Sequence, residues 1–249
     1  SEQYDECYIL PNSYKSAIIP LIARIKKRIS YLGEFRYGLI NIIKQPIERN
    51  LGMVNRYLNL IDQKHTDTVN PVINIKTNKE SIFKKFKFDG KYIVFCPDAE
   101  YGPAKRWPTN KWLNLAKDLS QHYNVIVVGL DISISHAFRP LESDKIINLI
   151  GKTNLVEVME IIALSEGVIS NDSGLMHVSA SLDKKIIALY GSSSPTYTPP
   201  LISKEKRDII YKDLHCSPCF KRVCPLGHTK CLNDIKVDEV KESVIKLFQ

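Results

Sequence analysis

Residues 167–191 read GVISNDSGLMHVSASLDKKIIALYG. The stretch opens with an apolar run, Gly167–Ser170, and closes with another, Ile186–Tyr190, while residues 174–183 between them have the composition and spacing of a helix. Continuous apolar strands that alternate with amphipathic helices are typical of a parallel sheet covered on both faces. The stretch therefore predicts one strand–helix–strand unit of a Rossmann-like α/β domain.

The same alternation begins at about Lys91. We expect strands at Tyr92–Cys96, Val125–Val128 and Ile146–Ile150. The first strand leads through a Gly- and Pro-bearing loop to a helix whose apolar residues recur every three to four positions, with Thr109 placed to act as its N-cap. This region predicts a complete parallel-sheet domain.

The upstream residues repeat the pattern less regularly, with strands near 7–10 and 29–31 and helices near 13–23 and 54–62. This region is small for a sheet domain of its own and is interpreted as part of one. The expected organisation is residues 1–75 as a partial N-terminal Rossmann-like domain, 76–90 as a linker, 91–236 as a second Rossmann-like domain and 237–249 as a C-terminal helix.

Composition sets broad limits on function. The 249 residues are 44% hydrophobic and carry a formal net charge of +8, which favours an anionic partner: nucleic acid, a phosphorylated ligand or an acidic membrane surface. The alternative source of part of that charge is AT-rich codon usage, which would enrich the chain in Lys, Ile and Asn. No apolar run reaches the ~20 residues of a membrane span, the first residues lack a signal-peptide pattern, and the few cysteines suit a reducing cytoplasm. GxGxxG, GxxxxGK[ST], HExxH and GxSxG motifs are absent from the sequence. The hypotheses of an oxidoreductase, a nucleotide triphosphatase and an α/β-hydrolase therefore lose their main support.

The first candidate site is the loop 96–108, CPDAEYGPAKRWP, which follows an expected strand. Ligands of open α/β sheets bind at the carboxyl ends of the strands, so Lys105 and Arg106 are placed to meet an anion there. Gly102 would let the backbone approach a phosphate. A solvated loop with two incidental basic residues is the alternative.

The second candidate is the turn 170–177, SNDSGLMH, between a strand and a helix. Asp172 could cap the helix and leave the N–H groups of Ser173 and Gly174 free for a phosphate. His177, one turn into the helix, could donate to an anionic oxygen. These residue types at a strand's carboxyl end favour an anion-binding function over a structural one.

A third group consists of Cys216, Cys219, Cys224 and Cys231. Four thiols so close in sequence could bind zinc tetrahedrally, but the spacing is that of neither a zinc ribbon nor a zinc finger. Metal binding and free thiols in a reduced loop both remain open, and no metal is assigned.

Taken together, GPAKRWP (102–108), NDSGLMH (171–177), ALYGSSSP (188–195) and CSPCFKR with its following cysteines resemble the ADP-heptose:lipopolysaccharide heptosyltransferases of glycosyltransferase family 9. The resemblance runs through the whole chain, including ILPNSYKSA near the start. It implies the GT-B architecture of two Rossmann-like domains, of which the first is incomplete here. The activity implied is inverting transfer of heptose from ADP-heptose to an inner-core heptose of lipid-linked lipopolysaccharide, with no metal and no cofactor.

The resemblance also implies roles for individual residues. Lys105 would neutralise the donor's diphosphate as the leaving group departs, with Arg106 beside it. Asp172 would hold heptose hydroxyls, and Ser173, Gly174 and His177 would form the turn around the phosphates. Enzymes of this kind work in the cytoplasm, peripherally at the inner face of the inner membrane, and without nucleic acid. Lys15, Arg28 and Arg36 are candidates for binding the acceptor, a solvated basic face being the alternative.

Three departures from the family pattern are visible. The strand and Gly-Asp loop that carry the family's general base have no counterpart in these residues, so no residue is assigned that role. Asp98 replaces a glycine and brings a negative charge toward the expected phosphate site, and Asp131 is a poor substitute for a ribose-binding glutamate. The alternative functions are therefore a truncated, catalytically inactive remnant that binds a nucleotide sugar, or that of a heptosyltransferase I of the same family.

Overall fold

The structure is a computed structural model that describes residues 3–48, 51–61 and 70–248. It divides into two compact units, the first formed by Ser1–Thr68 with Thr196–Thr198 and the second by Val69–Pro195 with Pro199–Gln249. The segment 76–90, expected to be a linker, contains a helix and belongs to the second unit, as does the expected C-terminal helix.

The first unit contains a small parallel sheet with the strand order β1-β2-β3. Ile9, Ala17 and Ile40 form its buried core. The two-residue strand β3 was not expected, because so short a run carries no readable alternation. The elements are β1 (Glu6–Tyr8), α1 (Tyr14–Ile22), β2 (Lys27–Ser30), β3 (Ile42–Ile43) and α2 (Gly52–Leu60).

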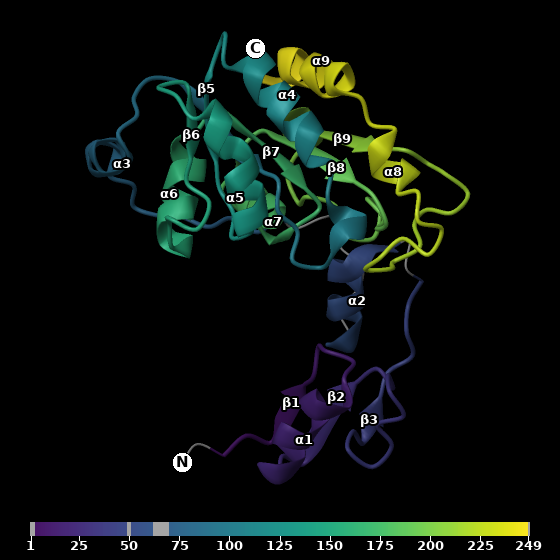
Figure 1. Ribbon diagram of the computed structural model, residues 1–249. Helices are drawn as coiled ribbons and strands as arrows, with labels where there is room; N and C mark the ends of the chain where they lie inside the picture. The colour runs from purple at the N-terminus through teal and green to yellow at the C-terminus, as the bar shows by residue number, and fades with distance from the viewer. Residues whose placement is uncertain (1–2, 49–50, 62–69, 249) are drawn as a thin grey trace. The chain divides into compact units, whose positions relative to one another are not determined.

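The second unit is built on a parallel sheet whose strand order, within the described residues, is β6-β5-β4-β7-β8-β9 (Figure 1). Its strands are β4 (Tyr92–Cys96), β5 (Asn124–Val127), β6 (Ile146–Asn148), β7 (Gly167–Asn171), β8 (Ile186–Tyr190) and β9 (Arg207–Tyr211). Its helices are α3 (Lys79–Phe86), α4 (Thr109–Leu119), α5 (Ile132–Phe138), α6 (Leu155–Leu164), α7 (Gly174–Ser181), α8 (Lys230–Asn233) and α9 (Val237–Phe248), with short 3₁₀ turns η2 (Pro103–Lys105), η3 (Arg139–Leu141) and η4 (Lys204–Lys206).

Helices cover both faces of this sheet (Figure 1), and the strand residues alternate between two cores. Ile93 and Phe95 of β4 pack with α4, α5 and α9, whereas Val94 and Cys96 pack with α3 and α6 on the other face. Successive side chains of a strand point to opposite faces, so a strand buried on both sides must be apolar throughout. Every residue of β4 is buried.

The fold class expected from the sequence is confirmed: both sheets are parallel throughout their described pairings. Two local expectations are corrected. The helix α4 begins at Thr109, and the cap position belongs to Pro108, which offers no side-chain hydrogen bond. The strand β9 and the helix α5, capped by the side chain of Asp131, were not expected. Within the described residues, no helix combines the length and apolar character needed to cross a bilayer.

Candidate functional site

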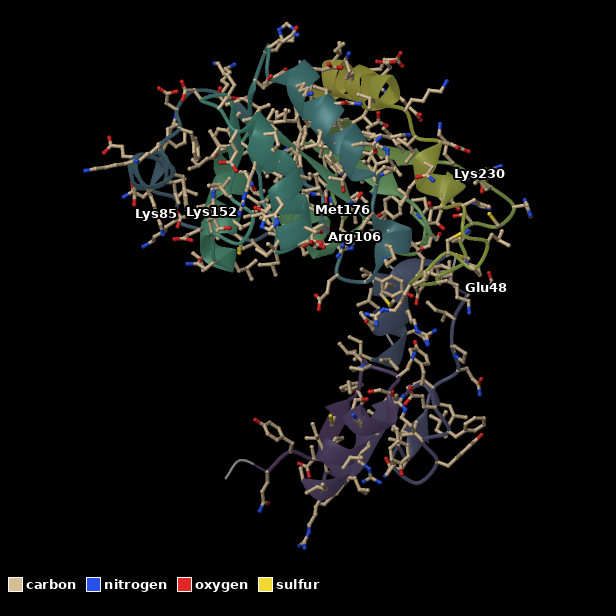
Figure 2. All side chains as sticks on the ribbon, in the orientation of Figure 1. Glu48, Lys85, Arg106, Lys152, Met176 and Lys230 are labelled. Atoms are coloured by element: carbon tan, nitrogen blue, oxygen red, sulfur yellow. The ribbon has the colours of Figure 1, made fainter. Side chains whose placement is uncertain are left out.

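The candidate site lies at the carboxyl ends of the strands of the six-stranded sheet. The loops that follow β4, β7 and β8 all leave the sheet at this edge, because the three strands are parallel neighbours. In open α/β sheets this edge is where ligands bind. Arg106, labelled in Figure 2, marks the loop after β4 that carries Lys105.

An ion pair joins two of these loops. Lys105 Nζ lies 2.5 Å from Asp172 Oδ2, and the side chains are only 16% and 3% exposed. The Ser193 hydroxyl, from the loop after β8, donates a hydrogen bond to the same carboxylate oxygen. The expectation that Asp172 caps the following helix is wrong: Ser173 occupies the N-cap of α7, and Asp172 holds Lys105 instead. The loops 96–108 and 170–177 therefore meet, as expected.

Asn171 fixes the path of the lysine-bearing loop, a role that sequence reasoning missed. Its side-chain nitrogen donates to Pro97 O at 2.6 Å, and its side-chain oxygen accepts from Trp107 N at 3.1 Å. Asn171 is fully buried, so both bonds form away from water. A single amide thus ties both ends of the loop to β7 and sets where Lys105 can reach.

Arg106 is engaged by two carboxylates of the same unit. Its guanidinium lies 3.1 Å from Asp98 Oδ1 and 2.5 Å from Asp131 Oδ2, while its Nε donates to Ala99 O. Asp98 Oδ2 also accepts from the backbone amide of Asp131 at 3.0 Å. The negative charge that Asp98 brings is therefore neutralised by Arg106, and the network joins the loops after β4 and β5.

The N-terminus of α7 provides a second anion-favouring element. Ser173 makes no side-chain capping bond, and a Cβ at the exposed Gly174 would meet no atom within 4 Å. Burial lowers the pKa of the His177 imidazole below its ordinary value, an effect opposed by Asp172 and reinforced by Lys105. A neutral imidazole still carries one N–H donor. The turn therefore offers backbone and side-chain donors beside Lys105.

The four cysteines come together around one small cavity of about 30 Å³. All four are free thiols, and no group of three metal ligands is assembled among the described residues. Burial, followed by the neighbouring cysteines, raises the pKa of Cys231, whereas backbone amides, first that of Thr229, lower the pKa of Cys224.

The loop that carries these cysteines packs against the lysine loop. Gly102 was expected to let the backbone approach a phosphate, but it allows close packing of the loop that carries the cysteines. A Cβ at Gly102 would lie 2.6 Å from Arg222 O, and the glycine has a φ of +146°. The requirement for glycine here is one of packing and conformation.

In the first unit, the three acceptor candidates differ in exposure. Lys15 is exposed, and Arg28 is half-buried with its guanidinium donating to Leu39 O and Ile25 O. Arg36 is fully buried and donates to Pro11 O and to the Ser30 hydroxyl. The expectation that Arg36 binds the acceptor is therefore corrected, because its buried guanidinium donates hydrogen bonds within the first unit.

The parallel α/β architecture places a lysine and the N-terminus of α7 at one edge of the sheet, which is where ligands of open α/β sheets bind. The family model for glycosyltransferase family 9 (heptosyltransferase) matches residues 1–230, and the chain belongs to this family.

Individual relatives support that assignment. The chain is 38% identical to a lipooligosaccharide heptosyltransferase 2 of Haemophilus influenzae, over 82% of this chain and 65% of that protein. It is 37% identical to a lipopolysaccharide heptosyltransferase 2 of Salmonella typhimurium, over 99% of this chain and 76% of that protein. The solved structure of Escherichia coli ADP-heptose lps heptosyltransferase II superposes with a TM-score of 0.78 at 34% identity, covering 98% of this chain and 76% of that one. This chain therefore spans about two thirds to three quarters of its relatives' length, and the GT-B expectation is confirmed.

Proposed function

We propose that this chain is a heptosyltransferase of type II, which binds ADP-heptose in its second unit and transfers heptose to an inner-core heptose of lipopolysaccharide. The observation that carries the proposal is the contact between Lys105 and Asp172 at the carboxyl edge of the sheet, beside the open N-terminus of α7. The Salmonella typhimurium and Escherichia coli relatives named heptosyltransferase 2 align over 99% of this chain at 37% and 36% identity. The Pseudomonas aeruginosa and Escherichia coli relatives named heptosyltransferase 1 align over 59% and 43% of it, at 24% and 31% identity.

The ion pair suits a donor that carries both a diphosphate and a sugar. The Lys105 ammonium would donate to diphosphate oxygens, and Asp172, held by Ser193, would accept from heptose hydroxyls. The amides of Ser173 and Gly174 and the His177 N–H would complete the phosphate side. Arg106 would act by holding the bordering loops, because both carboxylates in the network already engage its guanidinium.

The reaction would be a single displacement at the anomeric carbon. The bond from an acceptor hydroxyl oxygen to that carbon forms as the bond to the diphosphate oxygen breaks, and ADP leaves with the electron pair. Negative charge grows on the diphosphate during this step, so Lys105 would bind the transition state more strongly than the ground state. The hydroxyl proton must pass to a base, for which we assign no residue.

The acceptor is anchored in lipid, so transfer would occur at a membrane surface. A formal net charge of +8 would favour peripheral contact with the anionic inner face of the inner membrane. Exposed Lys15, with Arg28, remains a candidate for contacts to the acidic acceptor.

The test is to incubate the chain with ADP-heptose and a lipopolysaccharide acceptor that lacks the second heptose, and to measure ADP release and the mass of the acceptor. We expect the acceptor to gain the mass of one heptosyl residue, and Lys105→Ala to lower the rate by ~10²–10³. Saturable ADP-heptose binding without turnover would favour the binding-only alternative. Absence of binding by the folded chain would refute the proposal.

A further inference from the structure

The loop that carries the four cysteines, residues 216–231 and here termed the cysteine loop, is bonded to the lysine-bearing loop and to the loop after β8. Its far end is marked by Lys230 in Figure 2. Phe220 N donates to Ser192 O at 2.7 Å, and Ala104 N donates to Arg222 O at 3.1 Å. The cysteine loop is thus a fixed wall of the site.

Arg222 reaches the neighbourhood of Lys105 across one aromatic ring. The Lys105 Nζ lies 4.9 Å from the centre of the Tyr101 ring, and the Arg222 Cζ lies 5.4 Å from the same centre. The two cations are therefore at most about 10 Å apart. A diphosphate that accepts a hydrogen bond from one cation at each end could bridge such a separation.

The Tyr101 ring and the Arg222 side chain hold each other in place. The Tyr101 hydroxyl donates to Phe220 O at 2.8 Å, and Arg222 Nε donates to Tyr101 O at 2.8 Å. The second bond fixes the plane of the guanidinium, because Nε lies within it. The terminal nitrogens of Arg222 make no hydrogen bond or ion pair to another described residue.

Carboxylates already compensate the positive charges of Lys105 and Arg106, so a further cation would strengthen the binding of a diphosphate. Asp172 already compensates Lys105, and two carboxylates compensate Arg106, so neither contributes a full uncompensated charge toward a diphosphate. Arg222 is exposed and has no carboxylate partner among the described residues. A planar guanidinium matches phosphate oxygens in a two-pronged geometry, and pre-orientation reduces the entropy lost on binding.

We propose that Arg222 is a donor-binding residue that contacts the diphosphate of the nucleotide sugar, with Tyr101 as the platform that aligns Arg222 and Lys105. The inference rests on the proposed function, since it requires that the site accept ADP-heptose. It gives the cysteine loop a part in substrate binding in addition to its part in the fold.

The experiment is calorimetric titration with ADP on the unmodified chain and on Arg222→Ala, Arg222→Lys and Lys221→Ala. Lys221 is the adjacent exposed residue, so Lys221→Ala removes the same charge from the same loop and serves as the control. We expect Arg222→Ala to weaken ADP binding by about tenfold or more and Lys221→Ala by less than twofold. Arg222→Lys should recover part of the affinity, and the salt dependence of binding should become shallower in Arg222→Ala.

The outcomes separate this inference from the proposed function. If the unmodified chain binds ADP and Lys105→Ala weakens that binding while Arg222→Ala matches Lys221→Ala, the role of Arg222 is refuted and the proposed function stands. If Arg222→Ala loses affinity with an unchanged salt dependence and no recovery in Arg222→Lys, the residue is structural only. If the unmodified chain binds no ADP, both proposals fail.

Discussion

Removing the Lys105 ammonium should destabilise the second unit more than its position in a loop suggests. Asp172 is 3% exposed, and in Lys105→Met its carboxylate would keep the Ser193 hydroxyl but lose its counter-charge. Breaking a buried ion pair from one side costs about 3–5 kcal/mol, and because Lys105 is 16% exposed we expect about 3 kcal/mol. For a unit of this size, that loss lowers the melting temperature by roughly 6–12 °C.

The second unit carries its own reporter. Both tryptophans of the chain, Trp107 and Trp112, lie buried in that unit with their ring centres 5.2 Å apart. Urea unfolding followed by tryptophan fluorescence therefore measures the free energy of unfolding of the unit that contains the site. Lys117→Met, at an exposed position of α4, is the matched control and should change this free energy by less than about 0.5 kcal/mol.

The double variant Lys105→Met/Asp172→Asn decides the cause. The asparagine removes the buried charge and keeps an oxygen that accepts from Ser193, so we expect stability within about 1 kcal/mol of the unmodified chain. If Lys105→Met were as stable as Lys117→Met, or if the double variant were less stable than Lys105→Met alone, the reasoning from an uncompensated buried carboxylate would be refuted.

Three further predictions concern residues around the ion pair. Burial lowers the pKa of His177, so the folded chain favours the neutral imidazole. The free energy of unfolding should therefore decrease as the pH falls below about 6.5, where the unfolded chain takes up the proton. Between pH 7.5 and 5.5 the urea midpoint should fall less in His177→Gln than in the unmodified chain. Gly102→Ala places a Cβ 2.6 Å from Arg222 O and should lower both the melting temperature and the affinity for ADP. An unchanged melting temperature by thermal shift and an unchanged affinity by calorimetry would contradict the close contact between residue 102 and the cysteine loop. Gly174→Ala meets no atom within 4 Å, so its melting temperature should stay within about 2 °C while ADP binding weakens about tenfold, and equal affinity would argue against close approach of a phosphate to α7.

The buried strands and the meeting of the two loops could be predicted from the sequence, because a single physical rule determines each of them. Apolar strands such as Tyr92–Cys96 are recognisable because a strand buried on both faces needs apolar residues throughout. The meeting of Lys105 and Asp172 was expected because parallel strands deliver their following loops to the same edge. The strand Arg207–Tyr211 was missed because it lies at the edge of the sheet and is mostly half-buried, so its apolar pattern is weak.

The misassigned residues depended on contacts that no local pattern encodes. Arg36 looks like any surface arginine in sequence, and only the fold shows its guanidinium enclosed by carbonyl oxygens and a hydroxyl. Asp172 has the residue type of a helix cap, but the nearby Lys105 offers it a stronger partner than a backbone amide. The bond between Arg222 and Tyr101 spans 121 positions and has no periodic signal.

That separation has a consequence for synthesis on the ribosome. A chain whose translation has reached α7 already holds Lys105, Asp172 and His177, yet the segment that closes against Tyr101 has not been made. In such a nascent chain Arg222 does not yet contact Tyr101, so nucleotide binding should reach its full affinity only after the cysteine loop leaves the exit tunnel. The order of translation thus makes the contact between the cysteine loop and the lysine-bearing loop one of the last features of the second unit to form.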